Sequence, residues 1–177
     1  MSLILAVRKS PEEVLLMADF CHTNGESQVL VPHDPKIVVL SQSWILGMTG
    51  HSNADLLLLH GLDYDRIEDP LYHRERFRAL KEGDRDMQGN YYLARGGKAY
   101  CLNGAGIFWE VAKPFDTMGV GSSVALYLLK KGWPTDDLLG LGYRVIKECV
   151  EHFDGLRLPM VWASSVEAVV HTYEAEG

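Results

Sequence analysis

Cysteine, basic residues and long apolar runs are all scarce in this chain of 177 residues. Its three cysteines, Cys21, Cys101 and Cys149, are odd in number and unevenly spaced. This pattern indicates neither a disulfide framework nor a zinc site built from CxxC pairs. Cys149 and His152 have the spacing to share one helix face, but two such residues without a second pair are more typical of packing. The sequence therefore predicts no metal site.

Basic residues are outnumbered, with 17 lysines and arginines against 24 aspartates and glutamates, and the net charge is -7. A negative chain of this kind argues against nucleic acid or an anionic membrane as the main partner. Residues 73–86 form the densest basic stretch, but charges of both signs at helical spacing are typical of a solvated helix face. No apolar run approaches the roughly eighteen residues of a membrane span and no signal-peptide pattern opens the chain, so we expect a cytoplasmic protein.

Nucleotide-binding and common hydrolase signatures are missing as well. The glycine-rich stretch "GVGSS" at 119–123 lacks the Gly-Lys-Ser/Thr ending of a phosphate-binding loop, and a G-x-S-x-G elbow is absent. We therefore expect no nucleotide and no other cofactor. What is present is a 47% hydrophobic chain without repeats or long linkers, which suits one domain over residues 1–177 with a sizeable core.

Short apolar runs separated by turn residues predict strands that pair with their neighbours in the chain. The first two runs show little polar alternation, which is typical of a sheet that is covered on both faces. Glycine-rich pairs and triplets between the later runs are hairpin-turn signals. The predicted strands cover residues 2–8, 13–19, 36–40, 43–49, 90–95, 98–103, 106–111, 158–164 and 166–173.

Helical periodicity and capping residues predict four helices between these strands. They cover residues 51–62, 70–83, 122–132 and 134–153. The first opens with Ser52 followed by Asp55, a capping-box-like start, and Thr135 is the expected N-cap of the last. Runs of strands alternating with helix pairs favour an α+β fold in which helices cover antiparallel sheets. One such plan is a four-layer αββα sandwich, with two sheets face to face and a helix pair outside each.

This order of elements and three local motifs resemble the proteasome β-subunit family, most closely the bacterial proteasome-like peptidase that works with a ring ATPase. The motifs are "SLILAVR...VLLMAD" in the opening hairpin, "KIVVLSQSWILGMTGHSNADLL" in the second hairpin and first helix, and "MGVGSSVALYLL" before the third helix. The resemblance spans almost the whole chain. It implies the αββα sandwich of N-terminal-nucleophile hydrolases, peptide substrates, a homo-oligomeric ring and a ring ATPase unfoldase as partner. Leucine-rich stretches at 55–62 and 123–129 agree with helix faces buried between subunits.

Ser2 occupies the place of the nucleophile, where the family usually has threonine. In this chemistry the α-amine of the first residue is the base for its own side chain, so the amine must be freed by cleavage. Removal of Met1 before a small residue would expose that amine without a propeptide. Serine is also a frequent second residue in proteins, and this plainer interpretation stays open.

Four further residues match catalytic positions of the family. Asp19 matches the aspartate that organises charge beside the nucleophile, and Gly50 matches the residue whose backbone N–H stabilises the oxyanion. Ser122, with its neighbour Ser123, matches a serine near the N-terminus. Each also has a structural alternative, since Asp19 and Gly50 suit turns and the two serines suit a helix N-cap.

The family's lysine has no counterpart where the resemblance predicts it. Its place, five residues before Lys36, is taken by Val31, and the nearest polar candidate is His33. Lys36 is expected to match a different position and to point elsewhere. The site would then lack the cation that lowers the proton affinity of the nucleophile, and Val31→Lys would raise hydrolysis. The aspartate–serine pair expected after the last helix is also incomplete, since Asp154 has no serine nearby in the chain.

Three hypotheses for the function follow. The first is a peptidase subunit of a self-compartmentalised ring, which hydrolyses peptide bonds through an acyl-enzyme on Ser2 and is impaired by the missing lysine. The second is a catalytically inactive pseudoenzyme of the same fold that acts in assembly or binding. Retention of Met1 would favour the second, because a blocked amine cannot act as a base. The third is an N-terminal-nucleophile amidase that acts on a small molecule.

Overall fold

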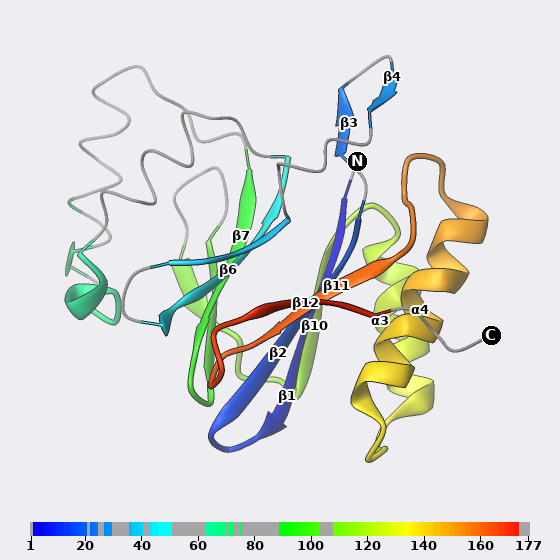
Figure 1. Ribbon diagram of the computed structural model, residues 1–177. Coiled ribbons are helices and arrows are strands. Elements are labelled where there is room, and N and C mark those ends of the chain that lie inside the picture. The colour runs from blue at the N-terminus through cyan, green and yellow to red at the C-terminus, as the bar shows by residue number, and fades with distance from the viewer. Residues whose placement is uncertain are drawn as a thin grey trace.

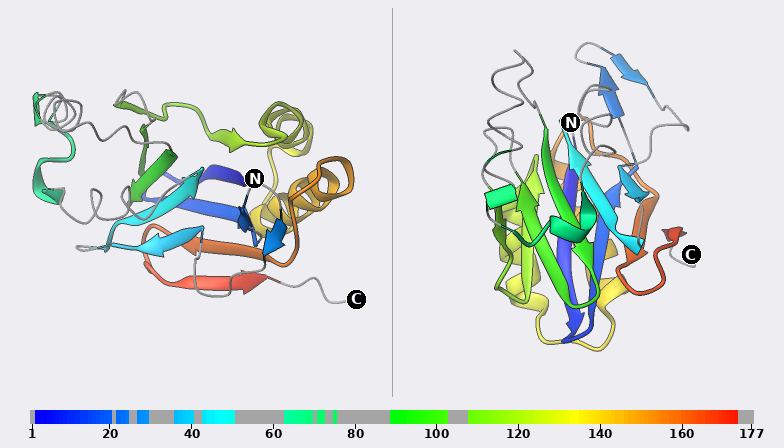
Figure 2. Two further views of the ribbon diagram at one scale, coloured as in Figure 1. Left: turned by 90° about the horizontal axis from the view of Figure 1, so that it is seen from above. Right: turned by 90° about the vertical axis from the view of Figure 1, so that its left-hand side faces the viewer.

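Two five-stranded antiparallel sheets, stacked face to face, form the body of the molecule (Figure 1). The computed structural model describes residues 2–20, 22–24, 27–29, 36–40, 43–50, 63–69, 71–72, 75, 89–102 and 108–173. A pair of helices packs outside one of the two sheets, as the view from above shows (Figure 2). The architecture is therefore an α+β sandwich, as the order of the elements predicts.

The first sheet has the strand order β10–β1–β2–β11–β12. Its strands are β1 (Leu3–Ser10), β2 (Glu13–Asp19), β10 (Phe115–Gly119), β11 (Met160–Ser164) and β12 (Val170–Tyr173). The predicted opening hairpin and the two predicted closing strands are confirmed. No strand is predicted at β10, because its sequence FDTMG lacks an apolar run. Pairing with β1 along its whole length compensates for that weak local preference.

The second sheet runs in chain order, β5–β6–β7–β8–β9, and each strand pairs with the next. Its strands are β5 (Ile37–Val39), β6 (Ile45–Thr49), β7 (Asn90–Arg95), β8 (Lys98–Leu102) and β9 (Phe108–Glu110). All five are predicted from the sequence, with ends that differ by a few residues. A separate hairpin of β3 (His22–Asn24) and β4 (Ser27–Val29) is not predicted, since each strand is only three residues long.

Helices α3 (Ser122–Gly132) and α4 (Leu138–His152) cover the outer face of the first sheet (Figure 1). In α4 the residues Leu141, Val145 and Cys149 are buried at a spacing of four, which places them on one helix face. Both helices confirm the predicted pair in the second half of the chain. Neither is long and apolar enough to cross a membrane.

The N-cap of α4 is Asp137, and the prediction of Thr135 is wrong. An oxygen of the Asp137 side chain accepts a 2.9 Å hydrogen bond from the backbone N–H of Gly140. Thr135 instead accepts a hydrogen bond from the N–H of Asp137, through its hydroxyl oxygen at 3.2 Å. Both residue types suit a cap, and here a carboxylate three residues before Gly140 satisfies the helix donor. Thr135 shapes the turn before the helix.

Both faces of β1 are buried, which explains the lack of polar alternation at the start of the sequence. Leu3, Leu5 and Val7 pack toward the helices, whereas Ile4 and Ala6 pack toward the second sheet. A fully buried leucine or isoleucine contributes about 1.5–3 kcal/mol relative to an exposed one. This strand therefore belongs to two hydrophobic cores at once, and its position in the sandwich is fixed from both sides.

The predicted helices of the first half of the chain fall largely outside the described residues. Residues 51–62, including Ser52 and Asp55, are not described, and of 70–83 only Leu71, Tyr72 and Glu75 are described, in helical conformation. A short 3-10 helix, Tyr64–Arg66, precedes them. The outer helix layer over the second sheet thus remains a prediction.

Candidate active site

Ser2 lies where the chain enters the first sheet, and it is only 7% exposed. Its carbonyl oxygen accepts a 2.8 Å hydrogen bond from the backbone N–H of Val120. The next residue, Leu3, pairs with Gly119 of β10. A Cβ atom on Gly119 would collide with the Ser2 carbonyl oxygen, and its φ of +100° also favours glycine. The end of β10 therefore fixes the backbone of Ser2.

Asp19, the last residue of β2, contacts both the start of β1 and a buried lysine. Its Oδ1 atom accepts a 2.8 Å hydrogen bond from the backbone N–H of Leu3. Its Oδ2 atom lies 2.5 Å from the Nζ atom of Lys36, and both side chains are inaccessible to solvent. An unpaired charge would be costly at such depth, and the ion pair offsets part of that cost for both side chains. Asp19 thus connects the ammonium of Lys36 to the backbone of Leu3, the residue that follows Ser2.

The prediction that Lys36 points elsewhere, and that the site lacks a lysine, is wrong. Lys36 directly precedes β5, and its carbonyl oxygen accepts a 2.8 Å hydrogen bond from the N–H of Met48 in β6. This pairing places the residue at the edge of the second sheet, with its side chain reaching Asp19 of the first. Counting back from Lys36 failed because it relied on a fixed length for the variable segment before the strand. The predicted gain from Val31→Lys loses its basis, and Val31 and His33 lie outside the described residues.

A recognisable signal for Lys36 is present in the sequence. A lysine that directly precedes a short apolar strand, here "KIVV", lies next to residues that are expected to be buried. A buried lysine requires a buried anion, and the aspartate that ends the apolar strand "EVLLMAD" is the obvious partner. The pair could have been proposed from the sequence on these grounds.

Gly50 follows β6 and brings a second strand end to the corner of the sandwich that holds Ser2. Its φ is +63°, so it turns the chain in a left-handed conformation. The side-chain methyl of Thr49, one residue earlier, lies 3.2 Å from the position a Cβ would take on Gly119. The strand ends at Ser2, Gly119 and Thr49 therefore lie side by side.

Ser122 and Ser123 open α3 close to this corner, but neither is its N-cap. The N-cap is Gly121, which has a φ of +74° and provides no side-chain cap. Ser122 is half-buried, and its carbonyl oxygen accepts a 2.7 Å hydrogen bond from the hydroxyl of Thr117 in β10. Ser123 is exposed. The N-cap interpretation is wrong for both serines, because the glycine before them already has the conformation that starts the helix.

The loop between α4 and β11 also reaches Asp19, through its backbone. The N–H of Arg157 donates to Oδ2 of Asp19 at 3.4 Å, and the N–H of Phe20 donates to the carbonyl oxygen of Arg157 at 2.9 Å. The ring of Phe153, in the same loop, lies 2.9 Å from the position of a Cβ on Gly121. Asp154, the aspartate that the resemblance points to in this loop, is exposed. The loop reaches Asp19 through the backbone N–H of Arg157 instead. Sequence patterns miss a support of this kind, because any residue type can provide it.

No family model and no curated protein matches the sequence. The fold is similar to that of BPH from Thiobacillus denitrificans in complex with epoxomicin, with a TM-score of 0.74, 18% identity, and coverage of 92% of this chain and 97% of that one. A second BPH structure from the same organism gives a TM-score of 0.72 and 19% identity over 92% of this chain and 96% of that one. Eukaryotic HslV from Trypanosoma brucei has a similar fold as well, with a TM-score of 0.74 and 18% identity. That match covers 92% of this chain and 98% of the HslV chain.

The chain has the proteasome-like fold. The matches cover 92% of this chain and 97–98% of the compared chains, so the fold that the resemblance to the proteasome β-subunit family implies is confirmed over most of the chain. At 18–19% identity the similarity establishes the fold, whereas activity and assembly require their own tests.

The proteasome-like chain brings most of the expected site residues to one end of its sandwich. Ser2 and Asp19 are linked through Leu3, and Gly50 and Ser122 lie at strand and helix ends that meet beside Gly119. Ser123 shows no contact with this group among the described residues. The catalytic roles that the resemblance gives to these residues remain predictions.

The described cysteines do not compete with Ser2 as nucleophiles. Burial, with a smaller effect of Asp116, raises the pKa of the Cys101 thiol to about 12. Burial raises the pKa of Cys149 to about 11, and nearby Glu148 adds to the effect. Both thiols are therefore protonated and weakly nucleophilic near neutral pH. Within the described residues, no cluster of His, Cys, Asp or Glu side chains is placed to hold a metal ion.

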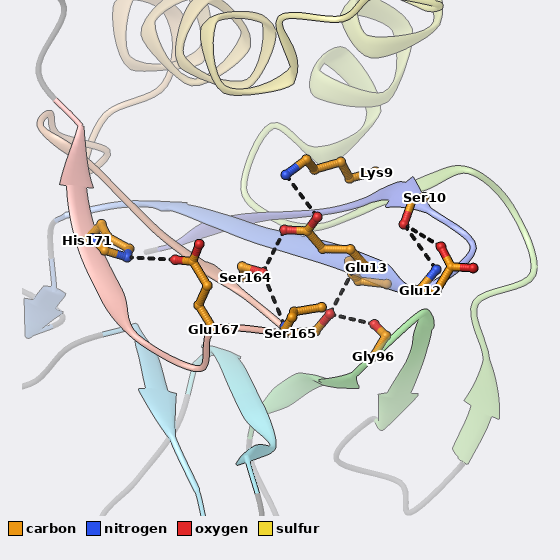
Figure 3. A network of polar contacts seen from close by, with 11 residues as sticks. Lys9, Ser10, Glu12, Glu13, Gly96, Ser164, Ser165, Glu167 and His171 are labelled. Carbon is orange, nitrogen blue, oxygen red and sulfur yellow. Dashed lines mark hydrogen bonds and ion pairs between the residues drawn. The ribbon is translucent and has the colours of Figure 1, made fainter.

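A polar network lies at the opposite end of the proteasome-like sandwich (Figure 3). The hydroxyl of Ser164 donates to Glu13 at 2.7 Å, and Lys9 forms an ion pair with the same carboxylate at 2.8 Å. The hydroxyl of Ser165 accepts from the N–H of Val14 at 2.8 Å and donates to the carbonyl oxygen of Gly96 at 2.5 Å. Burial raises the pKa of Glu13, but its hydrogen bonds to Lys9 and Ser164 outweigh this and lower it overall. The network joins both sheets and is structural.

Proposed function

We propose that the chain is a proteasome-like peptidase subunit that hydrolyses peptide bonds through Ser2. The observation that carries the proposal is the double contact of Asp19, with the N–H of Leu3 and with the ammonium of Lys36. It connects a buried cation, through Asp19, to the residue that follows the proposed nucleophile, and a cation favours the deprotonated forms of groups close to it.

The proposed reaction uses Ser2 as both nucleophile and base. After removal of Met1, the free α-amine takes the proton of Oγ as Oγ attacks the substrate carbonyl carbon. The carbonyl oxygen becomes an oxyanion, which the N–H of Gly50 stabilises. The peptide C–N bond then breaks, and the leaving amine takes the proton from the α-ammonium. Water attacks the resulting ester with the α-amine again as base, which releases the acid and regenerates Ser2.

In this mechanism Lys36 acts through its charge. A positive charge close to Ser2 lowers the proton affinity of the amine and the hydroxyl, so more of the base is available at neutral pH. Asp19 pairs with the lysine through one oxygen, and its second oxygen orients the start of the strand that follows Ser2. The proposal thus gives Lys36 the role of the family's lysine.

A pseudoenzyme of the same fold is the second candidate, and the 7% exposure of Ser2 favours it. A substrate carbonyl carbon must approach Oγ to about 3–3.5 Å, which requires access to the side chain. The small-molecule amidase would use the same residues and the same chemistry, and no feature of the described residues favours it over a peptidase.

A homo-oligomeric ring is the proposed assembly, with a ring ATPase unfoldase as partner and a cytoplasmic location. The fold similarity to BPH and HslV supports this proposal. So do the exposed side chains of Val124 and Tyr127, which leave an apolar area on the outside of α3.

Hydrolysis of a panel of fluorogenic peptides tests the proposed activity. We expect turnover by the protein from which Met1 has been removed, and turnover at background level for Ser2→Ala. Ser10→Ala is the matched control, because Ser10 lies on the same strand at its far end. Equal rates for the parent protein and Ser2→Ala would overturn the assignment of Ser2.

A further inference from the structure

A pocket of about 190 Å³ lies between the N-terminal end of α4 and the outer face of the first sheet. Its floor is apolar and is formed by β2, α4 and β11, through Leu15, Leu138, Leu139 and Trp162. Trp162 is half-buried, and its ring stacks on the ring of His171, with the two centroids 4.5 Å apart. Because two strands and a helix hold these side chains, the hollow is formed before any ligand binds.

The rim of this pocket is acidic, with four carboxylates against the ammonium of Lys9, the cation among the described lining residues. The carboxylates belong to Glu13, Asp136, Asp137 and Glu167. Two of them have a cation nearby, since Lys9 lies 2.8 Å from Glu13 and Arg144 lies 3.6 Å from Asp137. We call this hollow, with its apolar floor and its four carboxylates, the acidic pocket.

Negative charge is left over on the other two carboxylates of the rim. Asp136 is exposed, and its carboxylate has no hydrogen bond or ion pair with the described part of the chain. Glu167 is exposed as well, and its partner is His171 at 3.5 Å, a ring that is charged only when it is protonated (Figure 3). Because the whole chain has a net charge of -7, its field adds to the attraction for a cation. The acidic pocket therefore favours a positively charged ligand.

An anionic ligand does not suit this pocket, although a helix begins beside it. The N-terminus of a helix attracts anions through its free N–H groups and its dipole. In α4, Asp137 already takes that place, because its carboxylate accepts the 2.9 Å hydrogen bond from the N–H of Gly140. The carboxylates around the rim would repel a second anion.

We propose that the acidic pocket binds an arginine side chain that is presented by a partner polypeptide. The aliphatic stem of arginine suits the apolar floor, and its guanidinium suits the carboxylates of Asp136 and Glu167 at the rim. An indole ring such as that of Trp162 also attracts a cation. Arginine fits better than lysine because its planar, weakly hydrated guanidinium binds a carboxylate through two parallel hydrogen bonds and packs on aromatic rings.

The size and place of the pocket favour one side chain of a larger partner. Sites that enclose a small-molecule ligand usually measure about 300–1,000 Å³, whereas this pocket has about 190 Å³. Arginine is among the residues that anchor protein interfaces by filling such pockets. The acidic pocket shares Lys9 and Glu13 with the polar network at the far end of the sandwich from Ser2 (Figure 3). A docked partner leaves the candidate active site open, so the inference goes beyond the proposed peptidase activity and does not rest on it.

Titration calorimetry with two short peptides tests the proposed ligand. The probes are acetyl-Leu-Arg-Leu-amide and the same peptide with citrulline, whose neutral urea group replaces the guanidinium at nearly the same size. We expect saturable binding of the arginine peptide, and binding at least about tenfold weaker for the citrulline peptide. Added salt should weaken the binding of the arginine peptide, because the carboxylates of the rim that lack a cation are exposed. Equal affinities for the two peptides, or no saturable binding of the arginine peptide, would overturn the proposal.

Two double variants locate the binding site. Asp136→Asn/Glu167→Gln removes the surplus charge of the acidic pocket, and we expect it to weaken binding of the arginine peptide about tenfold. Glu110→Gln/Glu151→Gln is the matched control, because it removes two exposed carboxylates elsewhere and gives the same net charge. Unchanged binding in the first variant, or an equal loss in the control, would show that the peptide does not bind in the acidic pocket.

The Ser2→Ala variant separates the acidic pocket from the candidate active site. We expect it to bind the arginine peptide as the parent protein does, since Ser2 precedes β1 whereas Lys9 and Glu13 lie at the other end of the β1–β2 hairpin. Loss of binding in this variant would place the peptide at Ser2 and contradict the inference. An inactive protein that still binds the peptide through the acidic pocket would refute the proposed activity and leave this site standing.

Discussion

The Oδ2 atom of Asp19 and the Nζ atom of Lys36 lie 2.5 Å apart in the interior, where neither side chain is exposed to solvent. The pair links the two sheets, since Asp19 ends β2 of the first sheet and Lys36 precedes β5 of the second. The N–H of Leu3 donates a hydrogen bond to the other carboxylate oxygen of Asp19, which connects the pair to the residue that follows Ser2. The ion pair therefore ties the packing of the sandwich to the proposed chemistry.

Breaking this ion pair is expected to cost stability. Asp19→Asn keeps an acceptor for the Leu3 N–H but leaves the Lys36 ammonium without its anion, and removing one partner of a buried pair costs about 3–5 kcal/mol. Urea denaturation measures the loss. The double variant Asp19→Asn/Lys36→Met removes both charges, so it should recover much of the stability. A double variant less stable than the single one would contradict a buried charge pair.

Replacing Gly119 should disturb the backbone at Ser2. In Gly119→Ala the new Cβ collides with the Ser2 carbonyl oxygen, in addition to the strain of a positive φ. Gly96→Ala is the matched control, because Gly96 also has a positive φ, of +54°, but its nearest atom would lie 3.7 Å away. We expect a clearly larger fall in Tm for Gly119→Ala. Equal falls would show that the close contact with Ser2 is absent.

The buried thiols should resist alkylation in the folded protein. With pKa values of about 12 for Cys101 and about 11 for Cys149, both stay protonated at pH 8, and peptide mapping after iodoacetamide treatment should find them unmodified. A thiol whose pKa is raised on folding adds stability below its unfolded value of 9.0, which is lost as the pH rises toward the folded value. The free energy of unfolding should therefore fall between about pH 9 and 11. Rapid labelling at pH 8 would contradict the burial of these residues.

Ser165→Ala should weaken the polar network at the far end of the sandwich. It leaves the N–H of Val14 and the carbonyl oxygen of Gly96 without this hydroxyl, and such unsatisfied groups cost about 1–3 kcal/mol when buried. Chemical denaturation measures the change. Ser10→Ala, at a partly exposed serine whose hydroxyl contacts only Glu12 in the described network, should change stability by less than about 0.5 kcal/mol. A Ser165→Ala protein as stable as the parent would rule out this role.

Much of the fold can be predicted from the sequence because its signals are local. Apolar runs such as 2–8 and 13–19, with a turn between them, fix a hairpin, and the lack of polar alternation correctly indicates cover on both faces. β10 has no such apolar run, so its formation as a strand depends on pairing with β1, which is distant in the sequence. The choice between Thr135 and Asp137 as a helix cap likewise depends on geometry, since both residue types suit the position.

The candidate site was harder to predict, because its contacts join residues far apart in the chain. The family resemblance predicts Asp19 beside Ser2, and in the structure its carboxylate accepts a hydrogen bond from the N–H of Leu3, the residue after Ser2. Lys36 was assigned elsewhere because the length of the segment before it has no local signal. The support from Arg157 comes from a backbone N–H, which no residue type reveals.

The intact mass of the protein after incubation with epoxomicin, the compound bound in one similar BPH structure, tests most directly whether Ser2 is an N-terminal nucleophile. The account predicts loss of Met1 and a mass increase of one epoxomicin, located at Ser2 by fragmentation and absent from Ser2→Ala. Retention of Met1 with no adduct would contradict the proposed peptidase and favour the pseudoenzyme.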